Sequence, residues 1–501
     1  MPAKSPVIVA VDQGTSATKA IVVDRSGRIV NRSSVRVSRA DPRPGWVQQD
    51  ALEIKDSVVA AIENALEGLD VAVQAVGLSN QRESALAWDR RTGEPLGPLL
   101  GWQDRRTAPR AQALKSSRWS SVVKQRTGLP IDPMFSALKL QWLLDEVDAD
   151  RSSSGDGRIA LGTVDSWLVS ALTGEHRIEV GNASRTQLLD LASLDWDDEL
   201  LELFDIPRRC LPRVASSQEP TGSIRGVPAL GEDTTICGVL GDSHAALYAH
   251  GVRRAGQVKA TYGSGNSIMG LIDPDVAVDH GSSADDGLVR TVAWAEERPV
   301  YAFEGTVLST GATLVWLAQM FGTEPGELAK LAESVPDAGG VEIVPAFAGL
   351  GAPWWDESAT AVMCGFGLGT GPAQVAHAAF ESVALQTEAV LAAAENRLGT
   401  PTEMVLADGG PTRNDWLMQK QADLSQRRVA RSNVAELSAT GAGDMAGIAC
   451  GFWTAQECAE LPRDRTPFVP RMDAESARDR RLQWQHAVRR ARYRPEQHPT
   501  D

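Results

Sequence analysis

Two aspartates stand beside short turns of glycine and hydroxyl residues. Asp12 opens the turn Asp12-Gln-Gly-Thr-Ser16, and a second turn, Thr261-Tyr-Gly-Ser-Gly265, begins the other half of the chain. Each turn directly follows a strand-like apolar run. Glycine lets backbone N–H groups approach phosphate oxygens closely, and the hydroxyls add further donors. A single turn of this kind is more often an ordinary hairpin, but two of them, one in each half, favour a site that clamps a nucleotide.

Phosphoryl transfer also needs a carboxylate near a divalent cation and a group that accepts the proton of the attacking hydroxyl. Asp12 and Asp242 are suited to these tasks, because each ends a strand-like run. Either aspartate alone is better explained as a turn residue or a helix N-cap. His244 is expected to be a packed or capping histidine, since no second His or Cys stands at metal-ligand spacing. We expect Asp12 and Asp242 to converge on one gap between two lobes.

A third polar set is typical of a pocket for a polyol. It consists of Asn80-Gln-Arg-Glu83, at the end of a strand, and Trp102-Gln-Asp-Arg-Arg-Thr107. Charged groups hold polyol hydroxyls through paired hydrogen bonds, and an aromatic ring packs against the C–H face. A surface salt-bridge network is the alternative interpretation of both segments.

The elements that must position these residues alternate between strand and helix. The pattern predicts strands near 7–12, 18–24 and 73–79, a helix over 51–67, a strand-turn-strand over 257–270, helices near 308–320 and 374–396, a strand over 404–407 and a helix from about 413 to 425. The strand-turn-strand opening therefore occurs twice. We predict an α/β fold with two domains, residues 1–248 and 249–501, and a central cleft between them.

Several classes of protein are excluded. No P-loop is present, and the glycines of Gly365-Phe-Gly-Leu-Gly-Thr-Gly lack dinucleotide-fold spacing. The chain carries 50 Lys and Arg against 65 Asp and Glu, a net charge of −15, which disfavours nucleic acid and anionic membranes as partners. The five cysteines include no Cys-x-x-Cys pair, which indicates a reducing cytoplasm. The sequence contains no apolar run of about 18 residues, so we expect no membrane insertion. The arginine-rich stretch from Arg480 to Arg492 is interpreted as a solvated surface helix.

These segments together resemble the FGGY carbohydrate kinases, and most closely their glycerol kinase branch. In family order between residues 7 and about 453, the chain has Asp12-Gln-Gly-Thr, Asn80-Gln-Arg-Glu, Trp102-Gln-Asp-Arg-Arg-Thr, Met134-Phe-Ser-Ala-Leu-Lys, Gly162-Thr-Val-Asp-Ser-Trp, Asn182-Ala-Ser-Arg-Thr, Tyr262-Gly-Ser-Gly, Val344-Pro-Ala-Phe-Ala-Gly-Leu-Gly-Ala-Pro-Trp and Asp408-Gly-Gly. The resemblance implies two ribonuclease-H-like domains of the actin and hexokinase superfamily. It further implies ATP and Mg2+ as cofactors and a small polyol or sugar as substrate.

The resemblance also implies a role for individual residues. Asp242 is expected to be the general base, and Asp12 and Asp242 to lie at Mg2+. Phosphate contacts are expected from Thr15, Ser16, Ala17, Lys19, Gly263 and Ser264, and nucleoside contacts from Gly311, Val315, Gly410 and Asn414. The acceptor is expected to meet Arg82, Glu83, Trp102, Met134, Asp242 and Ser243.

Departures from the family pattern concern the acceptor. Met134, Ser243 and Ser267 stand where glycerol kinases usually have tyrosine, glutamine and phenylalanine, so the pocket should be larger and poorer in hydrogen bonds to glycerol. Glycerol and a C4–C5 polyol or ketose of the erythritol, threitol or xylulose type both stay open as acceptors. Lys19 replaces an arginine and keeps its charge without the planar fork.

Two other functions are compatible with this superfamily. One is a nucleotide-switched ATPase, like actin or a chaperone, which has no need of the Arg82, Glu83 and Trp102 constellation. The other is a catalytically silent sugar sensor, which has no need of Asp12 and Asp242. A homodimer or homotetramer is compatible with either interpretation and with a kinase.

Overall fold

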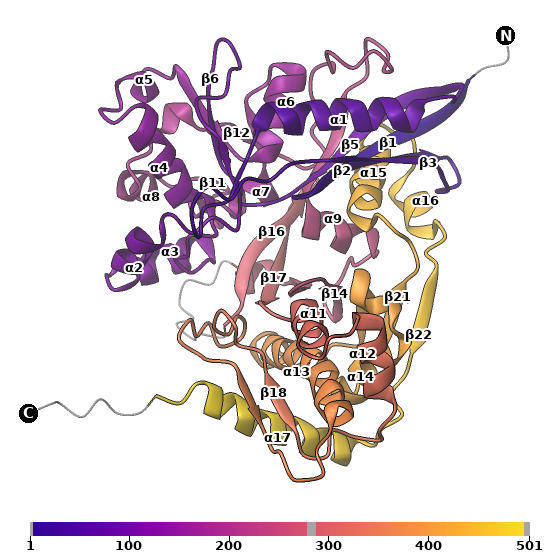
Figure 1. Cartoon of the computed structure of the whole chain (residues 1–501). Coiled ribbons are helices and arrows are strands. Elements are labelled where there is room, and N and C mark those ends of the chain that lie inside the picture. Colours follow the sequence, from indigo (N-terminus) through magenta and orange to yellow (C-terminus); the bar gives the residue numbers. More distant parts are fainter. Residues whose placement is uncertain (1–3, 278–286, 495–501) are drawn as a thin grey trace, which may run out of the picture.

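The computed structural model describes residues 4–277 and 287–494, and these form two lobes, each built on a β-sheet (Figure 1). The N-terminal sheet has the strand order β13-β5-β1-β2-β3. Its strands are β1 (Ser5–Gln13), β2 (Ala17–Asp24), β3 (Ile29–Arg36), β5 (Val71–Asn80) and β13 (Ile236–Gly241). The central strand β1 is an unbroken apolar run because helices cover the sheet on both faces.

The C-terminal sheet has seven strands in the order β16-β17-β15-β14-β20-β21-β22. Their bounds are β14 (Gln257–Tyr262), β15 (Asn266–Ile272), β16 (Val289–Ala295), β17 (Pro299–Val307), β20 (Met404–Asp408), β21 (Arg428–Ser432) and β22 (Arg465–Phe468). In both sheets three antiparallel strands are followed by two parallel ones, β3-β2-β1-β5-β13 and β17-β15-β14-β20-β21. The predicted duplicated α/β architecture is therefore confirmed.

Helix α1 (Ala51–Leu66) covers the outer face of the N-terminal sheet together with α6 (Val164–Thr173). Asp50 caps α1 by accepting hydrogen bonds from the N–H groups of Leu52 and Glu53. The helix buries one face, which includes Ile54 and Val58 at helical spacing. The C-terminal sheet is flanked by α11 (Gly311–Met320), α12 (Pro325–Glu333), α13 (Pro372–Leu398) and α14 (Asp415–Ser425).

Two helices each pack against the sheet of the other half of the chain. Helix α9 (Asp242–Ala249) continues directly from β13 of the N-terminal sheet, yet its apolar side chains pack against the C-terminal sheet. Helix α15 (Leu437–Ala449) comes from the C-terminal half and packs against the N-terminal sheet. Both lie between the two sheets (Figure 1). The contacts are so close that a Cβ atom at Gly77 would lie 2.2 Å from the carbonyl oxygen of Ala442, which requires glycine there.

The N-terminal lobe is enlarged by short elements inserted after β3. These are the two-stranded pairs β4 (Gln48–Gln49) with β7 (Leu99–Leu100), β6 (Leu86–Asp89) with β8 (Ile159–Gly162), β9 (Arg177–Glu179) with β12 (Arg213–Ala215) and β10 (Leu189–Asp190) with β11 (Asp195–Trp196), and the helices α2 (Ala108–Lys115), α3 (Trp119–Thr127), α4 (Ser136–Val147), α5 (Ser152–Gly155), α7 (Val180–Ser184), α8 (Asp198–Leu203) and η1 (Arg208–Cys210). The predicted boundary at residues 248 and 249 falls at the last turn of α9.

The C-terminal lobe also contains α10 (Pro274–Ala277), β18 (Glu342–Val344), β19 (Val362–Cys364), η2 (Gly410–Arg413) and α17 (Ala474–Ala491). Helix α16 (Ala455–Glu460) instead lies against the N-terminal lobe, where Cys458 packs in the same cluster as Ile8 and Val23. Helix α17 carries the arginine-rich stretch, and it is a surface helix as expected, with Arg489 and Arg490 exposed, but its inner face is not solvated. Trp484 and Val488 are buried against the lobe, and Arg480 bridges Glu342 and Glu381. One face of α17 is therefore part of the core.

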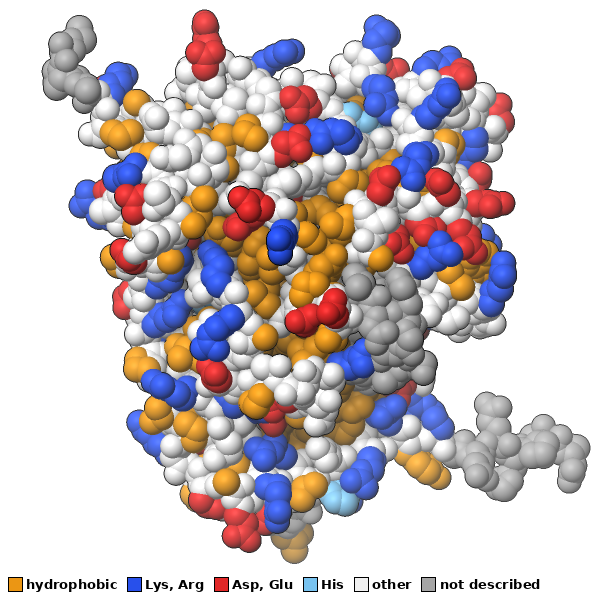
Figure 2. Space-filling model, turned by 180° about the vertical axis from the view of Figure 1, so that it is seen from behind, with side chains coloured by type: hydrophobic (Ala, Val, Ile, Leu, Met, Phe, Trp, Pro, Cys, Tyr) orange, Lys and Arg blue, Asp and Glu red, His pale blue; other side chains and the backbone are white. Residues whose placement is uncertain are grey.

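The surface combines apolar and charged areas. Figure 2 shows hydrophobic side chains gathered across the middle of the rear face, at the level where the lobes meet, with acidic and basic side chains interspersed over the rest. Among the described helices, none combines the length and the apolar character that crossing a bilayer demands.

Candidate active site

The site begins where neighbouring parallel strands end together. In the N-terminal sheet, Gln13 of β1 pairs with Asn80 of β5, which pairs with Gly241 of β13. Asp12 therefore lies at the same sheet edge as Asp242, the residue that follows Gly241. Ser79 donates a hydrogen bond of 3.0 Å to Asp12 Oδ1. Burial and the nearby Asp242 carboxylate raise the pKa of Asp12 to about 6. The expected convergence of these two aspartates is confirmed.

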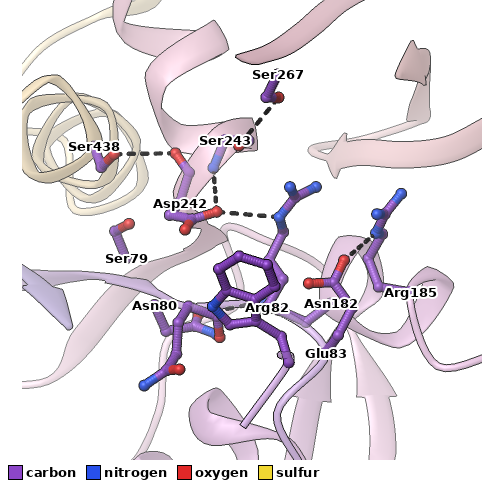
Figure 3. A network of polar contacts seen from close by, with 12 residues as sticks. Ser79, Asn80, Arg82, Glu83, Asn182, Arg185, Asp242, Ser243, Ser267 and Ser438 are labelled. Carbon is purple, nitrogen blue, oxygen red and sulfur yellow. Dashed lines mark hydrogen bonds and ion pairs between the residues drawn. The ribbon is translucent and has the colours of Figure 1, made fainter. Parts of the chain in front are cut away.

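Asp242 is held from three sides at the start of α9 (Figure 3). Its Oδ1 accepts hydrogen bonds from Arg82 Nε at 3.0 Å and from the Ser243 N–H at 2.6 Å. The Ser438 hydroxyl donates to its backbone carbonyl at 3.1 Å. The carboxylate is still 40% exposed. It is thus fixed in orientation and open to a bound molecule.

Arg82 belongs to a buried network of charges that joins the lobes. It donates two parallel hydrogen bonds to Glu304 on β17, and Arg185 lies within 3.0 Å of the same carboxylate. Arg185 also donates to Glu83, whose φ of 62° is unusual for a residue with a side chain. Although burial opposes it, the two arginines hold the pKa of Glu304 well below its usual range. The network fixes the orientation of the Arg82 head group.

The other predicted acceptor residues form a wall of mixed character. Trp102 is 37% exposed, and its Nε1 donates to Thr15 Oγ1 at 3.1 Å. The hydroxyls of Ser243 and Ser267 lie 3.5 Å apart, so two small side chains face each other beside Asp242. Met134 is partly buried and packs in a small cluster that includes Phe135.

A cavity of about 1060 Å³ gathers the predicted nucleoside residues at one place. Its lining includes the four predicted nucleoside residues Gly311, Val315, Gly410 and Asn414, and also Gly263 and Ser264, which were predicted to contact the phosphates. Glycine is required at position 311, because a Cβ atom there would lie 2.4 Å from the Gly263 carbonyl oxygen. Exposed Val315 and Trp316 supply apolar surface from α11.

A second cavity of about 520 Å³ contains Asp12 and Lys19 and shares Gly410 and Arg413 with the first. Lys19 Nζ forms a 2.7 Å ion pair with Glu436, so it does not point freely toward a ligand. Thr15, Ser16 and Ala17 lie in the adjoining β1–β2 turn, which the hydrogen bond from the Gly14 N–H to the Ala17 carbonyl closes. The two cavities together run from the predicted nucleoside residues to Asp12.

Sequence reasoning missed several residues of this site. Lys259 is completely buried on β14 and donates to Ser267 at 3.3 Å, and burial lowers its pKa. Glu304 and Arg185 were also missed. The signal available for Lys259 and Glu304 was a single charged residue within an apolar strand run. His244 is fully buried, as expected of a packed histidine.

The residues fit the groups that the resemblance implies. Carboxylate oxygens are the ligands that Mg2+ prefers, and Asp12 and Asp242 offer them at one edge. Burial is the main cause of the raised pKa of Asp12, and the Asp242 carboxylate adds to it, so a cation bound here would relieve the repulsion between the two groups. The glycine-lined cavity beside them has the size and the apolar wall expected for a nucleoside.

Fold and site together define a two-domain sugar kinase of the actin and hexokinase type. Residues 7–249 match the N-terminal domain of the FGGY family of carbohydrate kinases, and residues 258–450 match its C-terminal domain. The chain belongs to the FGGY family of carbohydrate kinases, and it is a carbohydrate or polyol kinase.

Similar proteins span nearly the whole chain. An apulose kinase from Pectobacterium atrosepticum is 41% identical over 499 residues, covering 98% of this chain and 99% of that protein. A glycerol kinase from Rhodopirellula baltica is 40% identical over 502 residues, covering 98% and 92%. The crystal structure of Plasmodium falciparum glycerol kinase with ADP superposes with a TM-score of 0.92 at 27% identity, covering 98% of this chain and 99% of that one.

Proposed function

We propose that this kinase transfers the γ-phosphoryl group of ATP to a primary hydroxyl of a small polyol, with Asp242 as the general base. The position of Asp242 carries the proposal. Its carboxylate is oriented by Arg82, remains partly exposed, and lies at the sheet edge that also holds Asp12. The hydroxyl oxygen bonds to the γ-phosphorus, the bond to the bridging oxygen breaks, ADP leaves, and the hydroxyl proton goes to Asp242.

The two cavities support the assignment of the donor. The nucleoside belongs in the 1060 Å³ cavity beside α11, and the phosphates in the adjoining cavity with Lys19 and the β1–β2 turn. Mg2+ bound near Asp12 and Asp242 supplies screening of the phosphate charge. Lys19 must exchange Glu436 for phosphate, or hold both, when ATP binds.

The acceptor belongs between the buried charge network and Trp102. Arg82 and Glu83 supply a cation and an anion for hydroxyl groups, and the half-exposed indole supplies a flat apolar face. A kinase for polyols needs such charged groups and an aromatic face to bind its acceptor, whereas an ATPase without an acceptor does not. The Rhodopirellula baltica relative is named glycerol kinase, and glycerol is the first acceptor to test.

A second candidate acceptor is a C4–C5 polyol or ketose. It is favoured by the 3.5 Å approach of the Ser243 and Ser267 hydroxyls, which leave room and polar partners beside Asp242 for a longer substrate. The Pectobacterium atrosepticum relative is named apulose kinase. A coupled ADP-release assay with glycerol, erythritol, D-threitol, D-xylulose and apulose decides between the candidates through kcat/KM. ADP release that does not depend on any of them contradicts the proposal.

Asp242→Asn tests the assigned base. It keeps the side-chain size, so acceptor and ATP binding should stay within about threefold while kcat falls by about a hundredfold to ten thousandfold. Asp24→Asn, at the far end of β2, is the matched control and should keep wild-type kcat. A near-normal kcat in Asp242→Asn would show that another group accepts the proton.

A further inference from the structure

A closed cycle of hydrogen bonds links the phosphate turn to the acceptor wall. Its members are Thr15, Gln49, Gln81, Ser84 and Trp102, and we call them the hydrogen-bonded cycle. They come from four separate segments of the N-terminal lobe: the β1–β2 turn, β4, the segment after β5 and the segment after β7.

Each neighbouring pair of residues in the cycle is joined by a hydrogen bond. Trp102 Nε1 donates to Thr15 Oγ1 at 3.1 Å, and Gln49 Nε2 donates to the Thr15 carbonyl at 2.9 Å. Gln81 Nε2 donates to Gln49 Oε1 at 2.9 Å. Ser84 Oγ donates to Gln81 Oε1 at 3.0 Å and accepts from the Trp102 backbone N–H at 3.1 Å, which closes the cycle.

The interior of the cycle is buried and fully paired. Gln49, Gln81 and Ser84 are each no more than 3% exposed. Both amide groups use their oxygen as an acceptor and their nitrogen as a donor, and Gln81 additionally donates to Gln13 at 3.1 Å. Breaking one hydrogen bond of the cycle would leave a buried amide group unpaired, which costs free energy. We therefore expect the five residues to keep their positions together.

Two neighbouring members of the cycle, Thr15 and Trp102, belong to the proposed sites of different ligands. Thr15 lies in the turn assigned to phosphate, and Trp102 lies in the wall assigned to the acceptor. Arg82 and Glu83, the charged acceptor residues, stand between Gln81 and Ser84 in the chain. Moving the indole or the Arg82 segment therefore displaces Thr15 or breaks a bond in the cycle.

We propose that the hydrogen-bonded cycle couples acceptor binding to nucleotide binding, with buried Gln49 and Gln81 as positioning residues. The proposal rests on the proposed function, because that function places the nucleotide phosphates at Thr15 and the acceptor at Trp102. An acceptor that fixes Trp102 also fixes Thr15 in the position that meets the phosphates. By linkage, ATP in turn strengthens acceptor binding by the same factor.

The test uses Gln49→Met, which keeps the length of the side chain and removes its donor and acceptor. The probes are Mg2+ with the nonhydrolysable analogue AMP-PNP, and glycerol, erythritol and D-xylulose, each titrated alone and in the presence of the other ligand by calorimetry. In the wild type, the acceptor that is phosphorylated fastest should tighten AMP-PNP binding about tenfold. In Gln49→Met this factor should fall below about twofold, while the Kd of each ligand alone changes less than about threefold.

Two further variants separate coupling from stability. Trp102→Phe keeps a smaller aromatic face and removes the Nε1 donor on a partly exposed side chain, so it should fold and should lose most of the coupling. Ser33→Ala removes a hydrogen bond of 2.6 Å between β3 and α1 in the same lobe and should keep the full coupling. A wild-type enzyme without coupling, or coupling that persists in both Gln49→Met and Trp102→Phe, overturns the proposal. Absence of phosphoryl transfer to any acceptor instead contradicts the proposed function.

Discussion

Arg82 and Glu304 form a two-point ion pair across the boundary between the lobes, with 3.1 Å from Nη1 to Oε2 and 2.9 Å from Nη2 to Oε1. Both side chains are nearly completely buried. The same guanidinium uses its Nε to hold Asp242 at 3.0 Å. The orientation of the proposed base in one lobe thus depends on a carboxylate from the other.

Replacing Glu304 by glutamine should affect both stability and activity. Arg82 and Arg185 would lose their shared carboxylate in a buried place, which should lower the free energy of unfolding by about 3–5 kcal/mol. The kcat should fall as well, because Arg82 is no longer fixed against Asp242. Urea denaturation and steady-state kinetics measure the two effects. Glu403→Gln, which breaks the exposed pair with Arg254, is the control and should change neither.

Gly311→Ala should weaken ATP binding selectively. The added methyl would lie 2.4 Å from the Gly263 carbonyl oxygen, so the turn that borders the nucleoside cavity must move. We expect the KM for ATP to rise about tenfold or more, with a smaller change in the KM for the acceptor. Gly367 has open space around it, so Gly367→Ala is the matched control. Equal ATP affinity in both variants would contradict the assigned cavity.

His176 should make the protein sensitive to acid. Burial lowers its pKa to about 4, and its ring packs edge-on against Trp88 at 5.1 Å. The unfolded chain binds this proton below about pH 6.5 and the folded chain only below about 4, so stability falls as the pH falls through this window. The slope attributable to this group reaches about 1.4 kcal/mol per pH unit.

His176→Gln should remove this part of the pH dependence. The free energy of unfolding, measured with urea between pH 4.5 and 7.5, should then vary less than in the wild type. His486 lies exposed on α17, and His486→Gln serves as the control. Identical pH profiles for wild type and His176→Gln would rule out the proposed contribution.

Arg480 should be required for the docking of α17. It is 15% exposed and pairs with Glu342 and Glu381, both of which are buried. Arg480→Met should lower the free energy of unfolding by about 3 kcal/mol because two buried carboxylates lose a partner. Arg478 on the same helix is 67% exposed, and Arg478→Met should have no measurable effect. If both variants melt at the wild-type temperature, α17 contributes no stability through Arg480.

Much of the fold was predictable because its signals are local. The Gly-Thr and Gly-Ser turns, the apolar strand runs and the helical spacing over 51–67 are each read within a few residues, and β1, β14 and α1 lie there. The second of these turns also predicted Gly263 and Ser264, which line the nucleoside cavity, whereas the other predicted residues of that cavity followed from the family resemblance. The positions of the turns follow from strand ends, which parallel pairing brings to one edge of a sheet.

The remaining parts of the site depend on contacts that no local pattern records. Glu304 meets Arg82 across 222 residues, and Gln81 meets Gln49 across 32. Nothing in the neighbourhood of these residues specifies the partner. Helix α17 is a different case, because the spacing of Trp484, Val488 and Ala491 is a local signal for a buried face. The arginines correctly indicated the solvated face, and the periodicity that marks the buried face was not used.

The exchange of α9 and α15 makes the two halves of this kinase interdependent. Separately expressed halves would each expose the sheet face that the missing helix covers, so we expect aggregation alone and recovery only when both are produced together. A chimera with a relative would have to inherit both helices and their glycine contacts from one parent. The two helices that join the lobes are therefore also needed for each half to fold.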